Sequence, residues 1–260
     1  MSANPTADRS GFTRRGFIKS GGAMLAAGAA PAVRARASGD GGMPAALGGA
    51  KAHARAWPSW PQWDPADDAE VAKVLHGRVW SRDRLVKEFE EKWAAAMGAG
   101  HCLAVVNGTN ALSASFMVLD IHPGDEVICA PYTFSASVFG VLYKGAMPVF
   151  ADIDPLTYQI DPAQIEAKIT PRTRAILPVH ICGYPSDMGR IMEIARKHKL
   201  FVVEDACQAH MSEIDGKKMG TFGTTGCFSF QTSKVMPIGE GGAILTDDAG
   251  FGSNSVFGGI

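Results

Sequence analysis

The chain has 260 residues, of which 46% are hydrophobic and 20% are charged, a composition typical of a globular protein with a large core and not of a disordered chain. Its 25 Lys and Arg residues and 26 Asp and Glu residues give a formal net charge of -1, so the overall charge favours neither nucleic acid nor an acidic membrane as a partner. The five cysteines are scattered singly without a CxxC pair, which indicates neither a zinc site nor a disulfide framework, and no metal is expected.

The first 37 residues have the composition of an export signal. Arg14 and Arg15 are followed by a weakly hydrophobic stretch rich in Ala and Gly over residues 20–33, and Ala35 and Ala37, on either side of Arg36, supply the small side chains for cleavage. The arginine pair indicates the twin-arginine (Tat) route to the periplasm or the exterior. The hydrophobic stretch is too short to anchor the protein in a membrane. The alternative is a leader that is never exported, which would keep the protein in the cytoplasm.

After the leader, residues 38–56 are rich in Gly, Ala and Pro and are expected to form a linker. The remaining residues, 57–260, alternate short apolar runs with amphipathic segments. This pattern predicts helices over residues 65–75, 82–97, 109–119, 136–143, 162–169 and 188–198 and strands over residues 101–106, 126–130, 148–151, 174–179 and 200–204.

The alternation of strands and helices predicts an α/β fold, a three-layer sandwich in which helices cover both faces of a mostly parallel sheet. Two further strands are expected over residues 226–230 and 243–246. They are joined without room for a helical crossover, which favours an antiparallel strand at this point.

Polar residues fall where predicted strands end, the edge at which such sheets bind ligands. Gly108 and Thr109 lie between a strand and a helix N-terminus, where free N–H groups favour an anion such as phosphate. Taken alone, this motif is better explained as a tight turn with a Thr cap. Asp205 ends a strand and is suited to hold a pyridine nitrogen protonated, with a turn or helix cap as the alternative. Gln208 follows close enough to reach the same ring.

Lys234 lies in a loop after the strand that contains Ser229. Met236, Pro237 and Ile238 flank it and are expected to desolvate its amine partly, which favours imine formation with an aldehyde. An isolated lysine is usually a solvated surface residue. The combination with Asp205 and the Gly108 turn favours a site for pyridoxal 5'-phosphate (PLP).

With these motifs the sequence resembles the DegT/DnrJ/StrS aminotransferases, fold type I PLP enzymes that mostly aminate keto-sugars attached to nucleotides. The likeness extends from about residue 57 to residue 242. It includes residues 106–112, 123–128, 132–134, 178–180, 204–209, 228–231 with Lys234, and 239–242.

The resemblance implies that residues 57–260 form a PLP-binding large domain and that Lys234 is the Schiff-base lysine and the base that moves the substrate proton. It also implies that His180 matches a family histidine, interpreted as structural or loop-positioning. The other implied cofactor contacts are Asp205 at the pyridinium nitrogen, Gln208 by the ring hydroxyl, Phe134 on the ring face, and Gly108, Thr109 and Ser229 at the phosphate.

The sequence departs from the family pattern in two ways. Cys207, Met211 and Ser212 replace smaller residues, which is expected to add bulk near the ring. Family members continue past residues 239–242 into a smaller C-terminal domain, whereas this chain stops at Ile260. The chain is therefore expected to be either a fragment of a longer protein or a truncated, inactive homologue.

The implied activity is transfer of an amino group, from glutamate in much of the family, to a keto-sugar acceptor by a homodimer. Lys234 argues against the sugar dehydratases of the family, in which histidine replaces this lysine. A noncatalytic, exported PLP-fold binding or regulatory protein is the main alternative. A PLP enzyme of another reaction type is a further one, because fold does not fix function.

Overall fold

The computed structural model describes residues 43–51, 53 and 55–252. The chain divides into two compact units, Met1–Pro58 and Ser59–Ile260. In the first unit the described residues include one short 3-10 helix, η1 (Ala45–Leu47). The predicted leader, residues 1–37, and the beginning of the predicted linker lie outside the described residues. In the described part of the chain, no helix combines the length and the apolar character that a membrane crossing requires.

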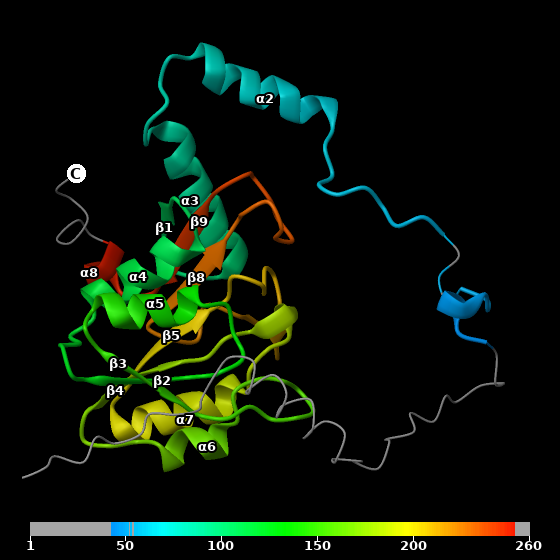
Figure 1. Ribbon diagram of the computed structural model, residues 1–260. Helices are drawn as coiled ribbons and strands as arrows, with labels where there is room; N and C mark the ends of the chain where they lie inside the picture. The colour runs from blue at the N-terminus through cyan, green and yellow to red at the C-terminus, as the bar shows by residue number, and fades with distance from the viewer. Residues whose placement is uncertain (1–42, 52, 54, 253–260) are drawn as a thin grey trace, which may run out of the picture. The chain divides into compact units, whose positions relative to one another are not determined.

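The second unit is built on a seven-stranded sheet (Figure 1). The strands of this sheet are β1 (His101–Val105), β2 (Glu126–Cys129), β3 (Met147–Phe150), β4 (Thr173–Leu177), β5 (Phe201–Asp205), β8 (Thr225–Ser229) and β9 (Gly242–Thr246). The helices are α2 (Pro65–His76), α3 (Arg84–Met97), α4 (Gly108–Val118), α5 (Ala136–Tyr143), α6 (Pro162–Ala167), α7 (Met188–His198), α8 (Ala249–Gly252) and the 3-10 turn η2 (Ile181–Gly183).

The strand order is β1-β9-β8-β5-β4-β2-β3. Strands β3, β2, β4, β5 and β8 pair in parallel, whereas β9 is antiparallel to both of its neighbours, β1 and β8. The prediction of a mostly parallel sheet with an antiparallel strand near residues 243–246 is therefore confirmed. Because β9 separates β1 from β8, β1 still points in the same direction as the parallel strands.

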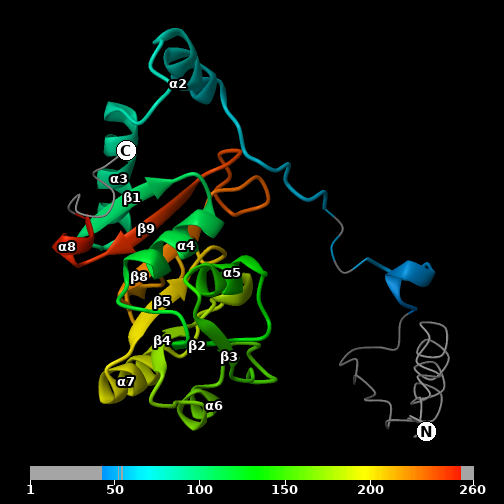
Figure 2. The same ribbon diagram turned by 60° about the vertical axis from the view of Figure 1, so that its left-hand side comes forward.

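Helices cover both faces of the sheet, as the three-layer prediction requires. Alternate side chains of a strand point to opposite faces, so Val127 packs with the α4 and α5 layer while Ile128 packs with the α3, α6 and α7 layer. Figures 1 and 2 show α6 and α7 on the side of the sheet opposite α4 and α5. The sheet is therefore packed between two clusters of buried hydrophobic side chains, one on each face.

Side-chain caps determine where several helices begin. Asp64 accepts a hydrogen bond from Ala66 N (2.6 Å) at the start of α2 and forms a capping box with Asp67. Asn107 Oδ1 accepts one from Asn110 N (2.9 Å) at the start of α4. The cap at Asn107 matters most for function, because α4 begins at the carboxyl edge of the sheet.

The sequence prediction lacked one small hairpin, β6 (Glu213–Ile214) and β7 (Lys217–Lys218). Its two turn residues, Asp215 and Gly216, have φ of 51° and 76°. Positive φ at both central positions is the mark of the type I' turn, for which Asp-Gly is a strong local signal.

Candidate active site

A cavity of about 500 Å³ opens at the carboxyl ends of β1, β5 and β8, beside the start of α4. All seven residues predicted to contact PLP line it, although they come from separate segments of the chain. The lining residues are Asn107, Gly108, Thr109, Leu112, Phe134, Ala136, Asp205, Cys207, Gln208, Ser229, Gln231, Ser233, Lys234 and Glu240.

The end of the cavity at α4 presents hydrogen-bond donors. The N-cap Asn107 engages the N–H groups of Asn110 and Ala111, which leaves those of Gly108 and Thr109 as free donors within the described part of the chain. A Cβ atom on Gly108 would lie 2.7 Å from Cys207 Sγ and 2.7 Å from Ser229 Cβ. Position 108 therefore accepts only glycine without rearrangement. The two free N–H groups lie at a helix N-terminus, a location that favours an anion.

Asp205 ends β5 and is 6% exposed. Its Oδ1 accepts a hydrogen bond from Cys207 N (3.1 Å), and its Oδ2 accepts one from Ser137 Oγ (2.6 Å). Burial, followed by the nearby Asp205 carboxylate, raises the pKa of the Cys207 thiol well above its usual value. Cys207 is thus a neutral thiol that packs against the Gly108 turn, and Asp205 is a buried acidic group of the cavity wall.

Gln208 and Phe134 also line the cavity. Gln208 Oε1 accepts a hydrogen bond from Cys182 N (2.8 Å), which leaves the Nε2 group of Gln208 as a donor. Phe134 precedes α5 and is 65% exposed, so its ring face is available for stacking. The contact with Cys182 was not predicted, because a backbone donor in another loop has no sequence signature.

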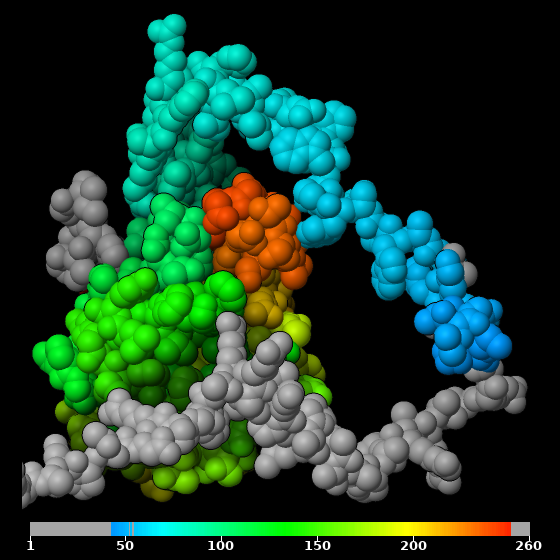
Figure 3. All heavy atoms as spheres, in the orientation of Figure 1, coloured from blue at the N-terminus to red at the C-terminus, as the bar shows by residue number. Residues whose placement is uncertain are grey.

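Lys234 is half-buried in the loop after β8. Trp60 Nε1 donates to Lys234 O (3.3 Å), and Lys234 N donates to Gln231 O (2.8 Å). No ion pair engages its amine among the described residues. Met236 and Ile238, which were expected to desolvate the amine partly, are 41% and 67% exposed on a loop at the protein surface (Figure 3).

Of the three residues expected to add bulk near the ring, only Cys207 lines the cavity. Met211 is 45% exposed and Ser212 donates to Gly183 O (2.9 Å), and neither lines the cavity. Glu240 and Gln231 do line the cavity but were not predicted, since nothing in the local sequence separates them from other loop residues.

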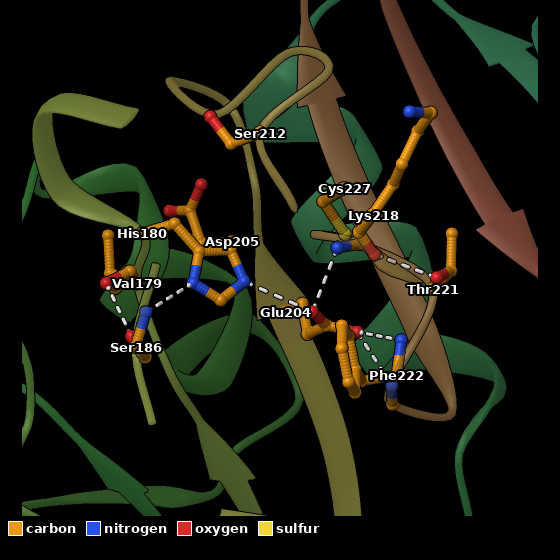
Figure 4. A network of polar contacts seen from close by, with 12 residues as sticks. Val179, His180, Ser186, Glu204, Asp205, Ser212, Lys218, Thr221, Phe222 and Cys227 are labelled. Carbon is orange, nitrogen blue, oxygen red and sulfur yellow. Dashed lines mark hydrogen bonds and ion pairs between the residues drawn. The ribbon is translucent and has the colours of Figure 1, made fainter. Parts of the chain in front are cut away.

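His180 lies in a buried polar network with Glu204 and Ser186 (Figure 4). It is not among the residues that line the cavity. Its Nδ1 accepts from Ser186 N (3.2 Å) and its Nε2 lies 3.0 Å from Glu204 Oε2. Because the backbone N–H fixes Nδ1 as an acceptor, Nε2 carries the hydrogen and donates to Glu204. These contacts agree with the structural interpretation of His180.

A larger cavity, of about 610 Å³, is lined mainly by apolar side chains of α3 and its surroundings. Its Arg82 is engaged by both carboxylate oxygens of Glu90 at 2.7 Å. Among the described residues no group of three or more His, Cys, Asp or Glu side chains is placed to hold a metal ion. The smaller cavity is the better candidate, because donors, an acid and an amine converge there.

The residues of the smaller cavity fit PLP. The free N–H groups beside the closely packed Gly108 suit a phosphate, Asp205 suits a pyridine nitrogen, and Lys234 provides an amine for an aldehyde. The volume of about 500 Å³ is within the range of small-molecule sites.

The fold is shared with aminotransferases of known structure. The aminotransferase from Psychrobacter cryohalolentis superposes with a TM-score of 0.73 at 38% sequence identity, over 75% of this chain and 50% of that one. Residues 61–252 match the DegT/DnrJ/EryC1/StrS aminotransferase family. The chain belongs to this family, which confirms the resemblance seen in the sequence.

Two curated relatives illustrate the match. GDP-perosamine synthase from Caulobacter vibrioides is 47% identical over 165 residues, 64% of this chain and 44% of that protein. UDP-N-acetyl-3-dehydro-alpha-D-glucosamine 3-aminotransferase from Acidithiobacillus ferrooxidans is 44% identical over 180 residues, 69% of this chain and 49% of that protein. The chain therefore spans about half the length of the curated relatives it matches.

Proposed function

We propose that this chain is the cofactor-binding part of a PLP-dependent aminotransferase that moves an amino group from glutamate to a keto-sugar, which is nucleotide-linked in the two named relatives. The observation that carries the proposal is the convergence of Lys234, Asp205 and the Gly108 turn on one cavity. Membership of an aminotransferase family supports the reaction class.

In the proposed reaction, Lys234 is the Schiff-base lysine, and its Nζ accepts and returns the proton at the substrate carbon. PLP, when bound, supplies an electron sink that stabilises negative charge at that carbon. Asp205 holds a proton on the pyridine nitrogen, and Gln208 donates from Nε2 to the ring hydroxyl. Phe134 stacks on the ring, while Gly108, Thr109 and Ser229 bind the phosphate.

The proposal is tested by adding PLP to the purified protein and recording its absorption spectrum. We expect a band near the visible edge in the wild type, its loss in Lys234→Ala, and its retention in the control Lys168→Ala, which changes an exposed lysine of α6's C-terminal end. A band that persists unchanged in Lys234→Ala would show that another group holds PLP.

The second candidate, a noncatalytic PLP-binding protein, is motivated by the proposed export, since nucleotide sugars are mainly cytoplasmic metabolites. The PLP-loaded protein is therefore mixed with glutamate. Conversion of the bound cofactor to its amine form supports the aminotransferase, whereas bound but inert PLP supports the binding protein.

Export through the Tat route is proposed from Arg14, Arg15 and the apolar stretch that follows. The test is mass spectrometry of the mature N-terminus. Removal of residues 1–37 supports export, and their retention would contradict it.

A homodimer is proposed because large apolar side chains remain exposed on and beside α2, including Leu75 (55%) and Trp80 (76%), and such patches often mark interfaces. Light scattering after size-exclusion chromatography measures the mass directly. A monomer at micromolar concentration would rule the dimer out.

A further inference from the structure

Two hydroxyl groups next to Asp205 have no role in the function proposed above. Ser137 is fully buried near the start of α5, and its Oγ lies 2.6 Å from Asp205 Oδ2. Thr133 Oγ1 lies 2.7 Å from the same Ser137 Oγ. The three side chains thus form a continuous hydrogen-bonded row that ends at the Asp205 carboxylate in the cavity wall.

The direction of these hydrogen bonds follows from the chemistry of the groups. An ionised carboxylate can only accept, so the hydroxyl of Ser137 must donate to Asp205. That hydroxyl has one hydrogen, so Thr133 must donate its own hydrogen to Ser137. A row in which every hydroxyl points toward the carboxylate is reinforced at each step, because each bond polarises the next.

The row holds the Asp205 carboxylate from the α5 side. The remaining contact, from Cys207 N to Oδ1 (3.1 Å), comes from the chain just after β5. With one oxygen engaged from each side, the carboxylate plane is fixed and the free lone pairs have a defined direction. Among the described residues, loss of the Ser137 contact would leave the carboxylate only a local backbone donor, Cys207 N, and would allow it to rotate.

Resting on the proposed function, we infer that Ser137 is a positioning residue that orients Asp205 toward the pyridine nitrogen of PLP, and that Thr133 orients Ser137. Thr133 directly precedes Phe134, the residue proposed to stack on the ring. The row therefore also connects the loop that carries the stacking ring to the carboxylate that meets the same ring.

The inference is tested with Ser137→Ala, Ser137→Thr and Thr133→Val in the full chain. The control is Ser113→Ala, because Ser113 is a buried serine of α4 whose hydroxyl makes no hydrogen bond in the structure. Each protein is titrated with PLP to obtain the dissociation constant. The pH midpoint of the bound-PLP absorbance change and the melting temperature are measured on the same samples.

We expect Ser137→Ala to weaken PLP binding by about tenfold, the size of one hydrogen bond to a charged group, and to shift the pH midpoint. Thr133→Val should change both quantities in the same direction by a smaller factor. Ser137→Thr keeps the hydroxyl and should restore both, while Ser113→Ala should match the wild type. If Ser137→Ala does not fold, the PLP affinity and pH midpoint of Thr133→Val provide the test instead.

Variants that melt at lower temperature but keep the wild-type PLP affinity and pH midpoint would overturn the inference, because the row would then be purely structural. That outcome leaves the proposed function intact, since wild-type protein still forms the band that Lys234→Ala lacks. Failure of the wild type to form any band would overturn the proposed function and this inference with it.

Discussion

Replacing Glu204 with glutamine should strongly destabilise the fold. Glu204 is a fully buried carboxylate that accepts four hydrogen bonds. Its Oε1 accepts from Phe222 N (2.7 Å) and Gly223 N (2.6 Å). Its Oε2 accepts from Gly220 N (2.8 Å) and from His180 Nε2 (3.0 Å).

A glutamine side chain keeps one acceptor oxygen and replaces the other with an NH2 group. In the more favourable orientation, its NH2 group faces the donors Gly220 N and His180 Nε2, so two hydrogen bonds to a charged group are lost. His180 cannot become the acceptor at Nε2 without placing a hydrogen on Nδ1, opposite Ser186 N. At about 1.5–3 kcal/mol for each lost bond, Glu204→Gln should cost about 3–6 kcal/mol, a large share of the usual stability of a domain.

Urea unfolding at pH 7, followed by tryptophan fluorescence, measures this cost. With an m-value of about 1–3 kcal/mol/M, the midpoint should fall by roughly 1 M or more. The matched control is Glu166→Gln, because Glu166 is exposed and binds Lys197 and His198 on the surface. Equal midpoints for the two variants would refute the assignment of Glu204 as the centre of a buried network.

Three further results are expected. Gly108→Ala, whose Cβ would lie 2.7 Å from Cys207 Sγ, should weaken PLP binding at least tenfold in a spectroscopic titration; unchanged affinity would show that the turn can relax. Burial lowers the pKa of His210 from its usual 6.5. As the pH falls, the unfolded chain therefore binds a proton at this residue before the folded protein does, and the free energy of unfolding should decrease below about pH 6.5. Urea unfolding at several pH values should show a smaller decrease for His210→Gln, and an equal decrease in both proteins would contradict the burial of His210. Maleimide labelling of the native protein, mapped by mass spectrometry, should modify the exposed Cys182 before the buried cysteines, whereas rapid labelling of Cys207 would contradict its raised pKa.

The sequence predicted most elements because their hydrophobic periodicity is strong. The helix predicted over residues 188–198 has those bounds in the structure, where apolar residues face the sheet and Asp187 caps the first turn. Strands agree to within one or two residues, since strand ends depend on pairing partners that lie elsewhere in the chain.

The candidate site was predictable where a residue follows a strand, because parallel strands end at one edge. Gly108, Asp205 and Lys234 meet this condition. Ser137 does not, because it lies 68 residues from Asp205 in the chain and only the packing of α5 against the sheet brings the two together. The surface position of Met236 could not be predicted from the sequence either. An apolar run in a loop has no periodicity that would indicate which side chains face solvent.

The position of β9 between β1 and β8 has a consequence for the order in which strands join the sheet during synthesis. β1 has no strand partner other than β9 in the described sheet, so during synthesis the segment that leads into α4 waits for residues 242–246 before it can join the sheet. Gly108 follows β1 and Ser229 ends β8, so these two residues of the cavity are brought together by β9, a strand that leaves the ribosome after both of them. Under the proposed function, cofactor capture should accordingly follow the insertion of β9 into the sheet.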